Sequence, residues 1–134
     1  MPDCLIRLVR TANELSNHEV TILLEAQREI LKVGGVLGLT SDLWFVIAGD
    51  SFSPYGILAC RTADDGAIWI QIAFVRTTMR RCGLLREMVN HLMAKCPGKE
   101  IGLGTKVTNQ PMLAAAEALG FRQKVAYLYR EAAQ

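Results

Sequence analysis

The sequence lacks the features that place a protein in a membrane or on a nucleic acid. No apolar run approaches the roughly 20 residues that a membrane-spanning helix requires. The opening Met-Pro-Asp-Cys contains no basic region followed by an apolar block, as a secretory signal would. The formal net charge of +2 is too small by itself to indicate a nucleic acid or an anionic membrane as partner. We therefore expect a cytoplasmic protein that binds no membrane.

Metal-binding and disulfide patterns are also missing. The four cysteines form no Cys-x-x-Cys pair, and only His18 and His91 are present as co-ligands. The cysteines are Cys4, Cys60, Cys82 and Cys96. We therefore expect neither a metal site nor a disulfide framework.

The composition is that of a folded protein. With 134 residues, 51% of them hydrophobic and 21% charged, the chain has enough apolar material for one core. It contains no internal repeat and no low-complexity segment. We predict a single domain spanning 1–134.

The first half of the chain indicates one helix and four strands. Residues 4–9 alternate in polarity as a strand does. Ser16 and Glu19 form a capping-box pattern that predicts a helix over 17–33. Its expected apolar face consists of Val20, Leu23, Leu24, Ile30 and Leu31. Apolar runs at 43–48, 55–61 and 67–75, joined by short turns, predict an antiparallel meander.

The second half indicates two helices and further strands. Leu84, Leu85, Met88, Val89, Leu92 and Met93 recur at helical spacing, and Pro97 with Gly98 ends that helix. A strand over 100–107 can then run parallel to 67–75 through a right-handed crossover. Asn109 and Gly120 are placed to cap another helix at its two ends, and 121–130 reads as one bent strand or two short ones.

The connection V-R-T-T-M-R-R-C-G-L-L, residues 75–85, is typical of a phosphate-binding loop. A strand that passes through a glycine turn into a helix presents free backbone N–H groups and the positive end of the helix dipole. Its positive charge is concentrated at Arg76, Arg80, Arg81 and Arg86. We expect the side chains of Arg76, Arg80 or Arg86 to pair with phosphate oxygens.

Two motifs resemble those of the GCN5-related N-acetyltransferase (GNAT) family. Val75, Arg80 and Gly83 match the acyl-CoA loop, valine and four residues followed by Arg/Gln-x-x-Gly-x-Gly/Ala, whereas Leu85 stands where the family has glycine or alanine. The second stretch, Asn109 to Phe121, is similar to N-x-x-A-x-x-x-Y-e-x-x-G-F. Its matching residues are Asn109, Glu117, Leu119, Gly120 and Phe121.

The resemblance implies an α/β fold of the GNAT type, with a mixed central sheet, an antiparallel meander and flanking helices. It also implies that acetyl-CoA binds with its pantetheine arm between the strands ending at Val75 and 107, which splay apart. The main chain of Phe74 and Val75 would bind the pantetheine amides, and Asn109 with Met112 would face the arm. The backbone N–H groups of Arg81, Cys82, Gly83, Leu84 and Leu85 would hold the pyrophosphate, and Arg80 would belong to the same cofactor site.

Two departures from the family concern proton transfer. The tyrosine that commonly protonates the leaving thiolate falls at Ala116, and a carboxylate often found on the strand falls at Gln71. Tyr127 and Tyr129 are candidate substitutes from the last strand. Alternatively, the thiolate leaves unassisted and water removes the amine proton, with Asp50, Asp64 or Asp65 attracting the amine. A third explanation is lost activity.

The favoured interpretation is an enzyme, an N-acetyltransferase. It would use acetyl-CoA as co-substrate and a primary amine of a small molecule or protein as acceptor. The amine would attack the acetyl group directly in a ternary complex. A catalytically inactive acyl-CoA-binding or protein-interaction module is the alternative. Nucleic-acid binding by the arginine cluster is disfavoured because the net charge is low and aromatic residues are not interleaved. An apolar final strand over 125–129 would allow a homodimer.

Overall fold

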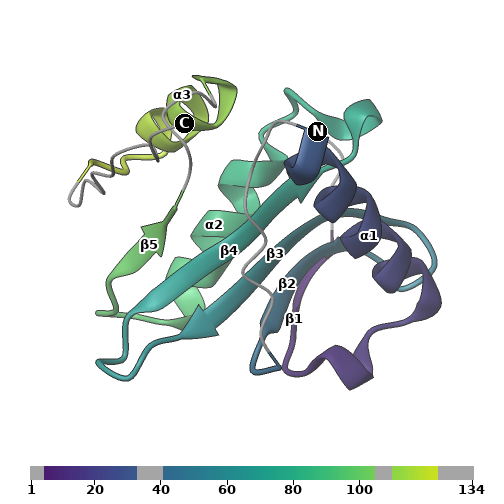
Figure 1. Ribbon diagram of the computed structural model, residues 1–134, viewed down its shortest axis with the longest axis horizontal. Coiled ribbons are helices and arrows are strands. Elements are labelled where there is room, and N and C mark those ends of the chain that lie inside the picture. Colours follow the sequence, from purple (N-terminus) through teal and green to yellow (C-terminus); the bar gives the residue numbers. More distant parts are fainter. Residues whose placement is uncertain (1–4, 33–40, 105–109, 124–134) are drawn as a thin grey trace, which may run out of the picture.

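The computed structural model describes residues 5–32, 41–104 and 110–123 (Figure 1). A five-stranded sheet in the order β1-β2-β3-β4-β5 forms its centre. The strands are β1 (Ile6–Val9), β2 (Trp44–Gly49), β3 (Pro54–Thr62), β4 (Ile68–Val75) and β5 (Ile101–Leu103). The helices are α1 (Asn17–Lys32), α2 (Leu84–Lys95) and α3 (Gln110–Ala118), with short 3-10 turns at Ala12–Glu14 and Thr77–Met79.

The sheet is mixed, as the sequence predicts. Strands β1 to β4 pair antiparallel with their neighbours. Strand β5 pairs parallel with β4 after the crossover through α2. The strand expected at 121–130 is not formed over 121–123, because the chain there leaves the turn that ends α3, and the rest of that range lies outside the described residues.

Both faces of the sheet are covered, which explains why its central strands are apolar throughout. In β2, Val46 and Ala48 belong to the core on the α2 side. Phe45 and Ile47, which alternate with them, belong to the core on the α1 side. Helices α1 and α2 therefore lie on opposite faces, as Figure 1 shows.

Helix α1 begins with the predicted capping box. The Glu19 N–H donates to Ser16 Oγ at 3.2 Å, and the Ser16 N–H donates to Glu19 Oε1 at 2.8 Å. Glu19 is fully buried and forms an ion pair with Arg7 of β1.

The prediction of the apolar face of α1 was partly wrong. Glu19, Ile22 and Ala26 are its buried residues, and Leu23 and Ile30 pack beside them. The other three expected residues, Val20, Leu24 and Leu31, are exposed. The capping box and the Arg7 ion pair turn Glu19 inward, and this rotates the buried stripe away from these three side chains.

Helix α2 buries most of its predicted apolar face. Leu84, Met88, Val89 and Leu92 are buried against the sheet, whereas Met93 is exposed. Among the described residues, no helix is long and apolar enough to cross a membrane.

Candidate functional site

A β-bulge in β4 marks the start of the candidate site. Ala59 of β3 is opposite Ile72, whereas the next residue, Cys60, is opposite Ile70. Gln71 is therefore an extra residue in β4. The bulge resets the alternation of side chains, because Ile70 packs on the α2 side of the sheet and Ile72 on the α1 side. Gln71, which stands where the family often has a carboxylate, is thus the bulged residue itself.

A gap between β4 and β5 opens at the same place. In the part of the chain that the structure describes, the parallel pairing covers three residues of each strand and ends at Ile70 opposite Leu103. Strand β4 continues to Val75 beyond that pair, and Figure 1 shows the two strands diverging in this direction. The second half of β4 therefore presents an edge that β5 does not cover.

The direction of the backbone groups along this edge follows from the pairing with β3. The Arg76 N–H donates to the Tyr55 carbonyl at 2.8 Å, which makes these two a hydrogen-bonded pair of the antiparallel ladder. Alternation then directs the N–H and C=O of Phe74 toward β3. The Phe74 carbonyl oxygen indeed lies 3.3 Å from the position a Cβ on Gly56 would take.

Ala73 and Val75 consequently direct their backbone groups into the gap. The alternation thus assigns to Ala73 the place that the sequence analysis gave to Phe74. The Val75 carbonyl accepts a hydrogen bond of 2.8 Å from Arg80 Nε, which confirms that it points away from β3.

The loop at the mouth of the gap holds two residues in the left-handed region. Arg81 has φ of 66°, which is unusual for a residue other than glycine, and Gly83 has φ of 77°. Gly83 precedes α2, and no side chain caps this helix end. The first N–H groups of α2 therefore have no partner within the helix, and helix ends of this kind are available to an anion. A Cβ on Gly83 would meet nothing within 4 Å, so this side of the loop is open.

Two of the arginines that were expected to bind phosphate are held by α1 instead. Arg76 donates from Nε and a terminal nitrogen to Glu25 at 3.2 and 3.3 Å. Arg80 donates to both carboxylate oxygens of Glu29 at 2.8 and 2.7 Å. These two guanidinium groups thus have carboxylate partners on α1, with charge-assisted hydrogen bonds, and their pairing with phosphate stays a prediction.

The remaining two arginines differ in their surroundings. Arg86 donates to the Ala118 carbonyl at 3.4 Å and so connects α2 to the end of α3. Arg81 is exposed, and the described part of the chain supplies it with no hydrogen-bond or ion-pair partner. Arg81 is thus the guanidinium best placed to meet an anion at this loop.

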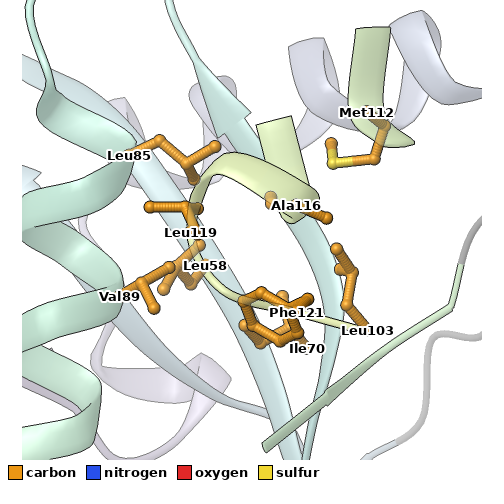
Figure 2. A pocket seen from close by; sticks show the side chains of 10 residues that line it. Leu58, Ile70, Leu85, Val89, Leu103, Met112, Ala116, Leu119 and Phe121 are labelled. Carbon is orange, nitrogen blue, oxygen red and sulfur yellow. The ribbon is translucent and has the colours of Figure 1, made fainter. Parts of the chain in front are cut away.

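An apolar cavity of about 10 Å³ lies at the closed end of the gap. Ile70 and Leu103, the last paired residues of β4 and β5, both line it. Figure 2 shows side chains of α2 and α3, Leu85, Val89 and Ala116 among them, around the same space. The small side chain of Ala116 leaves this space open.

No protein-family model matches this sequence, and neither does any curated protein. Solved structures do match in fold. An aminoglycoside N-acetyltransferase, AAC(6')-Iy in complex with CoA, matches with a TM-score of 0.65 at 15% identity, over 96% of this chain and 100% of that one. A predicted acetyltransferase with acetyl-CoA from Clostridium acetobutylicum matches with a TM-score of 0.62 at 13% identity, over 96% of each chain.

A third structure agrees with these two. The aminoglycoside antibiotic 6'-N-acetyltransferase AAC(6')-Ih from Acinetobacter baumannii matches with a TM-score of 0.61 at 15% identity, over 96% of this chain and 100% of that one. The chain has the GNAT fold. The fold resemblance stated from the two sequence motifs is therefore confirmed.

Helix α3 of the GNAT fold ends as the sequence predicts. Gly120 has φ of 91° and donates to the Glu117 carbonyl at 3.0 Å, while the Phe121 N–H donates to the Ala116 carbonyl at 3.0 Å. These two bonds form a Schellman motif. The turn places Phe121 against the core, beside the cavity that Met112 also lines.

Three predicted site residues are the motif residue Asn109 and the two substitute tyrosines of the last strand. Asn109, Tyr127 and Tyr129 lie outside the described residues. Their roles therefore stay predictions.

The acidic turn residues divide between the two ends of the sheet. Asp50 lies in the β2–β3 turn, at the end where β4 reaches Val75, and its side chain accepts the N–H groups of Phe52 and Ser53. Asp64 and Asp65 lie in the β3–β4 turn at the opposite end, where Asp65 accepts the Ala67 N–H. Only Asp50 is thus on the side of the gap.

Sequence reasoning missed two groups of residues at this site. The spacing of Glu25 and Glu29 puts them on one face of α1, but nothing in the sequence indicates that this face meets Arg76 and Arg80. Ala73 had no signal in the sequence either, because its orientation depends on the register with β3. Among the described residues, no three His, Cys, Asp or Glu side chains cluster as metal ligands would.

Proposed function

We propose that this protein is an N-acetyltransferase that transfers the acetyl group of acetyl-CoA to a primary amine. The observation that carries the proposal is the gap between β4 and β5, which runs from the bulge at Gln71 to the uncapped start of α2. One end offers an anion site and the other an apolar end, and an elongated molecule with a phosphate head fits this combination.

The backbone supplies the contacts that acetyl-CoA needs. The pyrophosphate would bind the N–H groups of the loop at Arg81 to Leu85, with the exposed Arg81 side chain adding charge. The pantetheine amides would pair with the gap-facing groups of Ala73 and with the Val75 N–H, as an added strand would. Two of the solved structures with this fold contain CoA or acetyl-CoA, which supports the assignment.

The reaction needs few special side chains. The amine nitrogen attacks the thioester carbonyl carbon, the C–S bond breaks, and the amine proton is transferred to solvent or to the departing sulfur. Gln71 and Ala116 have no proton to exchange at neutral pH. We assign the protonation of the thiolate to Tyr127 or Tyr129, and direct transfer in a ternary complex needs no covalent enzyme intermediate.

The acceptor is an amine that must reach the thioester at the apolar end of the gap, away from Asp50, which lies at the same end as the anion site. Two of the structures that share the fold are aminoglycoside N-acetyltransferases, which supports a small polyamine-like acceptor. An acceptor panel should therefore contain aminoglycosides, diamines and peptide amines.

Calorimetric titration with acetyl-CoA tests the cofactor site. Gly83→Glu places a carboxylate at the open side of the loop, and it should abolish binding by repulsion of the pyrophosphate. Gly98→Glu is a matched control, because Gly98 has φ of 74° and a Cβ there would also meet nothing within 4 Å. Equal binding by the two variants, or none by folded wild type, would overturn the proposal.

A catalytically inactive acyl-CoA-binding module is the second candidate, and the observation that favours it is Ala116. Its methyl group lines an apolar cavity where the family has a proton donor. Turnover separates the two candidates. If the wild type releases the CoA thiol with any acceptor of the panel, and Tyr127→Phe or Tyr129→Phe releases it more slowly, the protein is an enzyme. Binding of acetyl-CoA without turnover supports the inactive module.

A further inference from the structure

The cavity described above occupies a specific place in the gap. It begins at the last β4–β5 pair, Ile70 with Leu103, and Ala73 also lines it. Ala73 is therefore both a gap-facing backbone position and a wall of the cavity. The cavity thus adjoins the gap where β4 and β5 stop pairing, and Leu85, in the first turn of α2, lines its other side.

The polarity of the gap determines which end of a bound acyl-CoA meets the cavity. The anion site lies at the other end, where Val75 leads into the loop and α2. A molecule anchored there by its phosphates extends along β4 toward the bulge at Gln71. Its acyl group then reaches the closed end, beside Ile70 and Leu103. This step rests on the proposed function.

The lining of the cavity selects an apolar group. Among the described residues no polar side chain contributes to its walls, and its volume of about 10 Å³ is close to that of one water-sized sphere. Such a space is unfavourable for water, which would find no hydrogen-bond partners, but it accepts one additional carbon. Ala116 limits the cavity from the α3 side, and any larger side chain there would fill it (Figure 2).

We propose that this cavity is an acyl-chain subsite that accepts one carbon beyond acetyl, so that the protein binds propionyl-CoA in preference to acetyl-CoA, with Ala116 as the residue that sets the chain length. The transfer is otherwise the same. The amine nitrogen forms a bond to the propionyl carbonyl carbon, the C–S bond breaks, and the products are a propionamide and the CoA thiol, which retains the proton lost by the amine.

The expected preference follows from burial of one methylene group. Placing it in the cavity should increase affinity about fourfold for propionyl-CoA relative to acetyl-CoA. Butyryl-CoA adds a second methylene for which the cavity has no room. It should therefore bind about fivefold or more weakly than propionyl-CoA, as overpacking predicts.

Calorimetric titration of the wild-type protein with CoA, acetyl-CoA, propionyl-CoA and butyryl-CoA tests this order without any acceptor. Binding of CoA and acetyl-CoA with no gain for propionyl-CoA would overturn the subsite and leave the proposed function intact. No binding of CoA itself would overturn both.

Ala116→Val and Ala114→Val form a matched pair of variants. Both place a β-branched residue in α3, but Ala114 is exposed and does not line the cavity. Ala116→Val should abolish the advantage of propionyl-CoA over acetyl-CoA, while Ala114→Val should keep it. Thermal melting of both variants establishes that they are folded. The same fourfold advantage in both variants would contradict the role of Ala116.

Discussion

Arg80 donates to both carboxylate oxygens of Glu29 and, through Nε, to the carbonyl of Val75. One side chain thus joins the loop at the mouth of the gap to α1 and to the end of β4. Its guanidinium also lies over the Phe74 ring, 5.5 Å from the centroid. Together with Arg76 and Glu25, this pair fixes the loop against α1 before any ligand binds.

Glu29→Gln should weaken acetyl-CoA binding up to about fivefold, because the loop loses a charged contact that holds its bound conformation. The free energy of unfolding should fall by less than about 1 kcal/mol, since both partners are nearly half exposed. Calorimetric titration and urea denaturation measure the two effects. Arg28→Gln changes a charge on the exposed part of the same helix and should leave the affinity unchanged. Equal effects of the two substitutions would show that the contact between Glu29 and Arg80 does not organise the loop.

Gly49→Ala should destabilise the protein far more than Gly120→Ala. Both glycines have positive φ, of 101° and 91°. A Cβ on Gly49 would also collide with the Ser53 carbonyl and lie 2.9 Å from the Pro54 Cα, so the β2–β3 turn must shift. A Cβ on Gly120 meets nothing within 4 Å, and the cost there is only the left-handed backbone, about 1 kcal/mol. Thermal denaturation compares the two variants, and similar melting temperatures would contradict this difference.

The extent of the elements could be predicted because local signals agree with the fold. The apolar runs of β2, β3 and β4 are unbroken because both sheet faces are covered, and Ser16 with Glu19 begins α1 where the capping box says. The buried face of α1 could not be predicted in the same way. Its position depends on the ion pair of Glu19 with Arg7, a residue on another strand, and the helix sequence alone does not contain that partner.

At the candidate site, too, some features could be predicted from the sequence and others could not. The loop glycine and its helix are visible in the sequence as Gly83 and the apolar positions of α2. The bulge at Gln71 is not, because it exists only in the register between β3 and β4, and it decides which backbone groups face the gap. The ion pairs of Arg76 and Arg80 could not be predicted for a related reason: their positive charge suits a phosphate, but only the fold brings Glu25 and Glu29 to them.

Glu19→Gln should lower the free energy of unfolding by about 3 kcal/mol, because it leaves Arg7 without the charge that compensates its desolvation. Glutamine keeps an oxygen for the Ser16 N–H, so loss of the cap does not account for the effect. Urea denaturation at pH 7 measures it. The double variant Arg7→Met, Glu19→Leu removes both charges and should recover part of the loss. A double variant less stable than the sum of its two single variants would contradict this account.

Cys82 should be alkylated much faster than Cys60 at pH 8. Cys82 is exposed in the loop, whereas Cys60 is fully buried in β3. Burial, with a smaller contribution from Cys96 nearby, raises the pKa of the Cys60 thiol from 9.0 to about 12, so the reactive thiolate is scarce there. Because this pKa is raised in the folded state, the stability it contributes is present below pH 9 and lost as pH rises toward 12.

The same labelling experiment reports on the ligand, because Cys82 belongs to the loop that would hold the pyrophosphate. Acetyl-CoA at saturating concentration should slow iodoacetamide labelling of the Cys82 peptide, measured by mass spectrometry. It should leave Cys96, which is partly exposed at the far end of α2, labelled at an unchanged rate. Gly83→Glu should remove the protection of Cys82. If acetyl-CoA slowed both cysteines equally, a general stabilisation of the fold would explain the result, and the loop would not be the site of contact.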